Sequence, residues 1–374
     1  MSDINIAALV SYRIYPAKMG GQKGIALFYE HLSKLTPVKL LTIRDNECNE
    51  MPANIQVIAL FSNSKFRYIN IFNFFRARNY IRKNKISHLI VEHPYFGWLA
   101  LLLKWFSSVK IIIHSHNIEA CRFKSTGRWW WGILWHYERM THRIAHLNFF
   151  IQDNDRQYAI EKFKLDPAKC ETITYGIERD SAPVKEERQK ASSQLRELHK
   201  IDVASKILLF NGTLDYQPNR DALDIILGKI GPLLLQQTAF PYKIIICGNR
   251  LPAVYNHLSG YTNIIYAGFV DDIDLYFKGA DIFLNPVTDG GGIKTKVVEA
   301  LALDLSVVST ENGAIGIPVK IIGDKMKITE NGDWESFVNS ITNVNASSSI
   351  PPDFFDHFYW GNIVHKAFES IKQI

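Results

Sequence analysis

The order of apolar segments along the chain is what most limits how it can fold. Short runs rich in β-branched residues, such as Val38–Ile43 and Lys206–Phe210, alternate with longer segments in which apolar residues recur at helical spacing. Such alternation is typical of a parallel β-sheet covered by helices. The pattern weakens near 177–203 into a charged stretch, which predicts a connector followed by a surface helix, and then starts again. Because 374 residues are too many for one ordinary core, we expect two doubly wound α/β domains.

The predicted elements follow from the position of each apolar run. In the first half we expect strands at 4–10, 38–43, 55–58, 87–91, 110–114 and 146–151, and helices near 24–35, 66–83, 95–106, 128–141 and 153–163. In the second half we expect strands at 206–210, 243–247, 264–266, 281–284 and 306–309, and helices near 219–227, 272–278, 294–303 and 333–344. An aromatic segment at 354–371 predicts one or two closing helices. A ligand should then lie at the carboxyl ends of the strands, in a central cleft that the two domains face.

Composition and cysteine usage narrow the class of protein. Apolar residues make up 47% and charged residues 21% of the chain, as in folded globular proteins. No apolar run approaches the roughly 18 residues that span a bilayer, and the N-terminus lacks the basic region of a secretory signal. The four cysteines are scattered without a CxxC pair, which favours reduced thiols over disulfides or a zinc site. We expect a cytoplasmic protein.

Basic residues are unevenly distributed along the chain. A formal charge of +6 does not by itself imply nucleic acid, and we expect no nucleic-acid partner. Between Glu50 and Glu92, however, there is no acidic residue, while seven basic residues fall at 65–85 among many aromatic ones. Two interpretations are open. The segment is a helix that lies on an anionic membrane surface, or it packs its apolar stripe on the sheet with solvated arginines outside.

The stretch 281–300, DIFLNPVTDGGGIKTKVVEA, carries the most specific chemistry. A buried strand is followed by three glycines and then by a helix with two lysines in its opening turns. Glycines let backbone amides approach an anion, and a helix N-terminus adds partial positive charge. A glutamate one turn after the second lysine would accept hydrogen bonds from ribose hydroxyls. The alternative, a flexible turn with solvated side chains, is less consistent with glycines at a strand end followed by lysines. The candidate residues for binding this anion and the ribose are Gly290, Gly291, Gly292, Lys294, Lys296 and Glu299.

Two other patterns carry less weight. Asp272-Ile-Asp274 fits the DxD pattern of metal-dependent sugar transferases, but it precedes an amphipathic segment and is better interpreted as a helix N-terminus. The segment 20–24, GGQKG, lacks the GxGxxG spacing, and Arg44 rather than an acidic residue follows the second predicted strand. A nicotinamide cofactor is therefore not expected.

The stretch 281–300 resembles the donor-binding motif of the group 1 glycosyltransferases (family 4), which have the GT-B fold and retain anomeric configuration. In that family a glycine-rich loop meets the diphosphate, and a glutamate at the place of Glu299 holds the ribose. Many members carry an earlier glutamate where this chain has Gly291. A subgroup with a triple glycine lacks that earlier acid, and this chain is similar to the subgroup.

Further segments resemble the family in the family's order. The segment 114–119, HSHNIE, resembles one that implies His116 near the sugar, with Asn117 and Glu119 on the acceptor side. The segment 16–24 resembles the N-terminal glycine loop, which implies that Gly20 and Gly21 lie near the donor phosphates.

Segments of the second half show the same resemblance. The segments 210–219 and 268–270 resemble loops that meet the nucleotide, which adds Gly212 and Phe269 to the donor site. The segment 354–360 is similar to the closing segment that crosses back onto the first domain.

The resemblance covers nearly the whole chain. It implies a GT-B-like fold with an acceptor-side Rossmann-like domain at 1–180, a nucleotide-sugar-binding domain at 181–353 and a returning helical segment at 354–374. It implies sugar transfer from a nucleoside diphosphate sugar to a glycan or lipid-linked acceptor, in cell-surface polysaccharide or glycoconjugate synthesis. His116 and Glu299 are the candidate catalytic residues, and neither a cofactor nor a divalent metal is expected. Two alternatives remain open: a nucleotide-sugar epimerase or hydrolase, and a non-catalytic module that binds nucleotide sugars.

Overall fold

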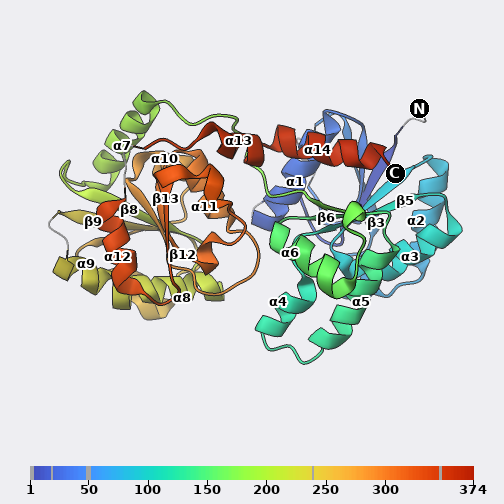
Figure 1. Cartoon of the computed structure of the whole chain (residues 1–374), viewed down its shortest axis with the longest axis horizontal. Helices are drawn as coiled ribbons and strands as arrows, with labels where there is room; N and C mark the ends of the chain where they lie inside the picture. The colour runs from blue at the N-terminus through green and yellow to red at the C-terminus, as the bar shows by residue number, and fades with distance from the viewer. Residues whose placement is uncertain (1–3, 18–19, 48–51, 238–239, 345–347) are drawn as a thin grey trace. The chain divides into compact units, whose positions relative to one another are not determined.

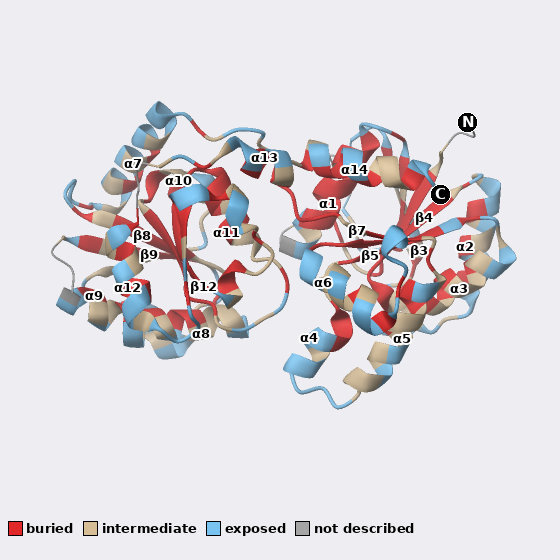
Figure 2. Ribbon diagram, in the orientation of Figure 1, coloured by how far each residue is buried: buried red, intermediate tan, exposed pale blue. Residues whose placement is uncertain are grey.

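The chain forms two compact units, each built around one parallel sheet (Figure 1). This computed structural model describes residues 4–17, 20–47, 52–237, 240–344 and 348–374. Unit 1 comprises Met1–Glu178 with Phe358–Ile374, and unit 2 comprises Arg179–His357. Buried strands lie between helices whose outer faces are exposed (Figure 2). The prediction of two Rossmann-like doubly wound domains is confirmed.

Unit 1 contains seven described strands and seven α-helices. The strands are β1 (Ile6–Leu9), β2 (Val38–Ile43), β3 (Ile55–Phe61), β4 (His88–Glu92), β5 (Lys110–Ser115), β6 (Leu147–Phe150) and β7 (Cys170–Thr172). The helices are α1 (Gly20–Ser33), α2 (Phe72–Lys83), α3 (Gly97–Phe106), α4 (Glu119–Ser125), α5 (Trp131–Ile144), α6 (Asp153–Tyr158) and α14 (Trp360–Lys372).

Unit 2 contains six described strands and the remaining helices. The strands are β8 (Lys206–Asn211), β9 (Tyr242–Cys247), β10 (Ile264–Gly268), β11 (Ile282–Asn285), β12 (Ser306–Thr310) and β13 (Met326–Thr329). The helices are α7 (Lys185–His199), α8 (Gln217–Ile225), α9 (Gly231–Gln237), α10 (Ile273–Gly279), α11 (Thr295–Ala302), α12 (Trp334–Asn343) and α13 (Pro352–Phe358), whose last residue belongs to unit 1.

In the middle of each sheet, the direction in which successive strands are added reverses. In unit 1 the order is β3-β2-β1-β4-β5-β6-β7, and in unit 2 it is β10-β9-β8-β11-β12-β13, with parallel pairing throughout. The central strands are buried on both faces, which explains their continuous apolar runs. The chain winds outward from β1 and β4, and from β8 and β11. Loops at the carboxyl ends of these strands are where open α/β sheets bind ligands.

Most elements lie close to their predicted positions, but the helix predicted at 66–83 is wrong as a single element. A short 3₁₀ turn at Lys65–Tyr68 precedes α2, and side chains replace the helical backbone bonds between them. Asn70 Oδ1 accepts from the amide of Phe72 at 3.0 Å, and Asn73 Nδ2 donates to the carbonyl of Arg67 at 2.8 Å. The prediction also misses the edge strands β7 and β13 and the helices α4 and α9.

The last helix, α14, packs in unit 1 beside α1 (Figure 1). Main-chain bonds fix its start: the Ile177 amide donates to Phe358 at 2.7 Å, and the Trp360 amide donates to Ile177 at 2.9 Å. The Trp360 ring is buried so closely over Gly176 that a Cβ there would lie 2.3 Å from it. In the part of the chain that the structure describes, no helix combines the length and apolar character needed to cross a bilayer.

Candidate functional site

Three loops at the carboxyl edge of the second sheet carry predicted donor residues. Gly212 follows β8, Phe269 follows β10, and Gly290–Gly292 follow β11. Gly290 and Gly292 have φ angles of +93° and +77°, which residues with a Cβ rarely adopt. The side chain of Phe269 is exposed. The structure therefore places these residues along one edge, and the glycine loop needs glycine at two of its positions.

Lys296 connects α11 to the loop after β8. Its ammonium donates to the Asn211 carbonyl at 3.2 Å and to Asn219 Oδ1 at 3.0 Å. The same ammonium lies 4.7 Å from the centre of the Phe210 ring. Burial, and to a lesser degree the neighbouring Lys294, lowers the pKa of Lys296 to about 7. The amine of Lys296 thus lies where the strand order reverses, and burial disfavours its charged form.

Lys294 precedes α11 and turns back onto the glycine loop. Its ammonium donates to the carbonyls of Gly290 and Gly292, at 2.7 and 3.1 Å. Burial lowers the pKa of Lys294 to about 8, although Asp289 opposes that shift. Asp289 also accepts from the Gly290 amide at 2.6 Å, so this amide, predicted to face the donor, already has a partner within the loop. The predicted helix start is therefore corrected: Lys294 is the N-cap residue, and only Lys296 lies within the helix.

Two lysines lie at the N-terminus of α11. No side chain caps it, and the hydrogen bonds described for Lys294 and Lys296 all go to uncharged oxygens. Among the described residues, neither ammonium is paired with a carboxylate at salt-bridge distance. Glu299 lies one turn further along α11 and is partly buried. An anion at this position would meet two lysines and the positive end of the helix.

In unit 1, His116 belongs to a buried cluster at the carboxyl ends of β4 and β5. The Glu92 carboxylate meets His116 Nε2 at 2.6 Å, His114 Nδ1 at 3.0 Å and the Tyr29 hydroxyl at 2.5 Å. Glu92 is fully buried, whereas the His116 side chain is 13% exposed. Burial alone would raise the pKa of the Glu92 carboxyl, but His114 and His116 lower it well below its ordinary value. The cluster therefore holds a carboxylate anion.

A second chain of contacts leads from this cluster to Glu119. The His93 ring stacks on His116 with centroids 4.5 Å apart, and its Nδ1 lies 3.4 Å from Glu119 Oε1. Glu119 Oε2 accepts from the Tyr95 hydroxyl and from the Arg122 Nε, each at 2.9 Å. Burial would raise the pKa of Glu119, but His93 and Arg122 lower it to about 2.

The remaining predicted residues of unit 1 lie nearby in the chain. Glu119 begins α4 without capping it, because the two side-chain oxygens of Glu138 accept from the amides of Glu119 and Ala120, both at 2.9 Å. Asn117 is partly buried, and its carbonyl accepts from the Ser115 hydroxyl at 2.8 Å. Gly20 begins α1, and Gly21 in its first turn is exposed.

Sequence reasoning missed four polar residues that organise these sites: Glu92, His93, Asn211 and Asn219. One signal was available. Glu92 and His93 stand where a buried strand ends, which is where functional side chains of parallel sheets gather. Asp272, by contrast, was interpreted correctly as a helix N-cap, since its side chain accepts from the Leu275 amide at 3.1 Å.

Glu92, His114 and His116 offer three potential metal-ligand atoms within 4.8 Å of one another. Hydrogen bonds account for the arrangement, because each imidazole meets a different carboxylate oxygen at hydrogen-bond distance. The absence of a divalent metal therefore stays a prediction.

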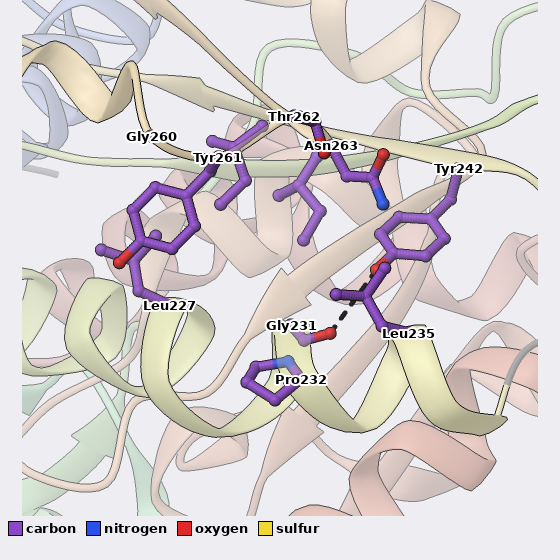
Figure 3. A pocket seen from close by; sticks show the side chains of 11 residues that line it. Leu227, Gly231, Pro232, Leu235, Tyr242, Gly260, Tyr261, Thr262 and Asn263 are labelled. Carbon is purple, nitrogen blue, oxygen red and sulfur yellow. Dashed lines mark hydrogen bonds between the residues drawn. The ribbon is translucent and has the colours of Figure 1, made fainter.

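A separate cavity of about 180 Å³ lies at the opposite, amino-terminal ends of β9 and β10 (Figure 3). Leu227, Pro232 and Leu235 line one side, and the Tyr242 hydroxyl reaches the Gly231 carbonyl at 3.5 Å. The lining is mainly apolar and contains none of the predicted donor residues.

Two Rossmann-like units with polar sites at their carboxyl edges define a protein of the GT-B class. Residues 20–181 match the family model described as Glycosyltransferase Family 4, and residues 205–346 match the one described as Glycosyl transferases group 1. The chain therefore belongs to the group 1 glycosyltransferases, family 4.

Curated and solved proteins resemble the chain to different extents. A Klebsiella pneumoniae protein described as an uncharacterized 44.6 kDa protein in the cps region is 27% identical over 182 residues, which is 46% of each chain. The match thus spans about half the length of that relative. Sucrose-phosphate synthase from Thermosynechococcus elongatus is 14% identical with a TM-score of 0.74, covering 99% of this chain and 98% of that chain. HepE of Anabaena, solved with UDP and glucose, is 13% identical with a TM-score of 0.73 and full coverage of both chains. At these identities the solved structures establish the fold.

Proposed function

We propose that the chain transfers a sugar from a nucleoside diphosphate sugar to a hydroxyl of a glycan or lipid-linked acceptor, with retention of anomeric configuration. The observation that carries the proposal is the lysine pair at the start of α11. In the described part of the chain, both ammonium groups bond only uncharged oxygens, and burial lowers the pKa of Lys294 and of Lys296. A donor diphosphate would supply the anion that they lack. HepE, solved with UDP-glucose, supports this class of donor.

The proposed chemistry needs stabilisation of the leaving group. The bond between the anomeric carbon and the diphosphate breaks, the acceptor oxygen bonds to that carbon, and the acceptor proton passes to the departing phosphate. The amides of Gly291 and Gly292, the α11 N-terminus and Lys296 would stabilise the negative charge that develops there.

Other residues would orient the donor. Glu299 would accept hydrogen bonds from the ribose hydroxyls, and His116 of unit 1 would contact the transferred sugar. The amides of Gly20 and Gly21 would approach the phosphates, as expected for a helix start.

Substitution of the donor residues tests this assignment. Lys296→Ala and Glu299→Ala should each lower turnover at least about tenfold, since each removes a charged contact of the bound nucleotide. Lys229→Ala is the matched control, because Lys229 is an exposed lysine of the same unit, remote in sequence from the glycine loop. Near-normal turnover in both site variants would remove the donor-site assignment. Nuclear magnetic resonance of the product's anomeric proton tests retention.

Incubation with the donor alone separates transfer from the alternatives. A transferase should leave most donor intact until an acceptor is added. Rapid epimerisation or nucleotide release without acceptor would favour an epimerase or hydrolase. Donor binding without turnover across a broad acceptor panel would favour a non-catalytic module.

We also propose that the surface around 65–85 holds this protein on the cytoplasmic face of an anionic membrane. The inner stripe of α2, including Phe74 and Ile81, packs in the core of unit 1, as one of the two interpretations expected. At the start of α2 and in the turn before it, Phe72, Phe66 and Ile69 are exposed by 67% to 74%. The same segment carries five exposed basic residues: Lys65, Arg76, Arg82, Lys83 and Lys85. Exposed apolar side chains and positive charges on one segment fit an anionic bilayer.

Vesicle sedimentation tests the membrane surface. Replacing Phe66, Ile69 and Phe72 together by serine should weaken binding to phosphatidylglycerol vesicles at least about tenfold, because each exposed side chain contributes about 1 kcal/mol or more when buried. Val203→Ser, at an exposed apolar position of unit 2, is the control. Equal binding of the triple variant and the wild type would contradict the assignment.

A further inference from the structure

The Glu92 cluster contains one carboxylate facing three proton donors. Oε1 of Glu92 meets the Tyr29 hydroxyl at 2.5 Å and His114 Nδ1 at 3.0 Å, and Oε2 meets His116 Nε2 at 2.6 Å. An ionised carboxylate accepts hydrogen bonds and donates none. Each imidazole must therefore carry its proton on the nitrogen that faces Glu92: Nδ1 of His114 and Nε2 of His116.

Because the proton lies on Nε2, the other ring nitrogen of His116, Nδ1, carries no proton when the ring is neutral. Nδ1 of His116 has no hydrogen-bond partner among the described residues, and it is not one of their buried unpaired atoms. The side chain is 13% exposed, whereas the Glu92 side chain is fully buried. In the neutral ring, Nδ1 is then a hydrogen-bond acceptor that solvent reaches.

We propose that Glu92 is a positioning residue that fixes His116 as the Nε2–H tautomer and thereby presents Nδ1 as an acceptor for a sugar hydroxyl. The part that concerns the sugar rests on the proposed function, in which His116 contacts the transferred sugar. Stacking of His93 on His116, with ring planes 24° apart, limits rotation of the ring. Glu92 acts through His116 and does not itself touch the substrate.

Contacts with Tyr12 and Glu119 keep the His93 ring from competing for Glu92. The Tyr12 hydroxyl lies 2.9 Å from His93 Nε2, and Glu119 lies on the Nδ1 side of the same ring. Since Glu119 is ionised, the consistent assignment puts the His93 proton on Nδ1, and the Tyr12 hydroxyl donates to Nε2. All three donors of the Glu92 cluster therefore remain directed at Glu92.

The substitution Glu92→Gln keeps the shape of the side chain but leaves one hydrogen-bond-accepting oxygen in place of two. A glutamine amide has one oxygen and one NH₂ group, so it cannot accept from donors on both sides. The oxygen is expected at the Oε1 place, where it serves both Tyr29 and His114. The NH₂ group then faces His116 Nε2, which must become an acceptor. The proton of His116 moves to Nδ1, and the solvent-facing nitrogen changes from acceptor to donor.

The experiment records ¹⁵N spectra of histidine-labelled full-length protein at pH 8, with His116→Ala to assign the signals. The wild type should show His116 as the Nε2–H tautomer, and Glu92→Gln should show the Nδ1–H tautomer. His142 is an internal control in the same unit, because its Nδ1 faces Asn148 Oδ1 at 2.9 Å and should not change. In parallel, kcat/KM of Glu92→Gln should fall about 10- to 100-fold, as when an orienting partner is lost.

Several results would overturn the proposal. One is a wild-type spectrum in which His116 carries its proton on Nδ1 or on both nitrogens. This result can be obtained without any variant other than the one used for assignment. Another is an unchanged His116 tautomer in folded Glu92→Gln. A stoichiometric metal ion in the purified protein would assign Glu92 and both histidines as ligands instead. A changed tautomer with unchanged kcat/KM would refute the positioning role alone, while failure of the wild type to use any donor would refute the proposed function and leave the tautomer assignment intact.

Discussion

Binding of the donor should take up protons, because the lysines that would meet its diphosphate are partly neutral in the free protein. Burial lowers the pKa of Lys296 to about 7 and that of Lys294 to about 8. A bound diphosphate favours the charged ammonium and should return both pKa values towards the ordinary value of about 10.4. Protons are therefore taken up at any pH between the free and the bound pKa values.

The expected number of protons taken up follows from the pKa values of Lys296 and Lys294. At pH 6 both lysines are already charged, so binding should take up only about 0.1 proton. At pH 8 Lys296 should contribute about 0.9 and Lys294 about 0.5, a total of about 1.4 protons. By linkage, the dissociation constant should rise about twentyfold between pH 6 and pH 8. In Lys296→Met, proton uptake at pH 8 should fall to about 0.5 proton. The dissociation constant should then rise only about twofold between pH 6 and pH 8.

Isothermal calorimetry measures this uptake directly. Each titration is repeated in HEPES and in Tris, whose ionisation heats differ. The ligand is the nucleoside diphosphate sugar that raises the melting temperature most in a panel of UDP-, GDP-, ADP- and dTDP-sugars. The phosphates of such a donor do not titrate in this range. Equal heats in the two buffers at pH 8 would refute the reasoning, since the lysines would then be charged before binding or remote from the donor.

Two further predictions concern unit 1. Gly176→Ala should destabilise the protein by about 1–3 kcal/mol in thermal denaturation, because the new Cβ would lie 2.3 Å from the Trp360 ring, whereas Gly132→Ala, with open space around it, should be neutral or stabilising. Burial raises the pKa of Glu138 to about 8 although two backbone amides lower it, so the folded protein holds a proton that the unfolded chain loses near pH 4.3. Protonation of Glu138 therefore contributes its full stability below about pH 4. This contribution to the free energy of unfolding is lost as pH rises from about 4 through 8, by at most about 1.4 kcal/mol per pH unit. The melting temperature of the wild type relative to Glu138→Gln should fall between pH 5 and pH 8, and a constant difference would contradict the assigned shift.

The sequence predicts the sheets well because buried parallel strands leave a local signal. The run at 38–43 coincides with β2, and the run at 110–114 lies within β5, since both strands are covered on each face. The edge strands Cys170–Thr172 and Met326–Thr329 are short and partly polar, so no apolar run marks them. The break near Ile71 depends on side-chain bonds of Asn70 and Asn73, which helical periodicity does not reveal.

The candidate site is only partly visible in the sequence for a similar reason. The glycines and lysines of 290–296 are contiguous, so their chemistry can be inferred from spacing. The partner of Lys296, Asn219, lies 77 residues away, and Glu92 lies 24 residues from His116. Such partners meet only because neighbouring strands bring their carboxyl ends to one edge of the sheet.

A crystal structure of the protein with its preferred nucleoside diphosphate sugar tests the central claim most directly. The account predicts phosphate oxygens within hydrogen-bond distance of the Gly291 or Gly292 amide and of the Lys296 ammonium, with Glu299 on the ribose. A nucleotide bound elsewhere, with this loop and the α11 N-terminus empty, would contradict it.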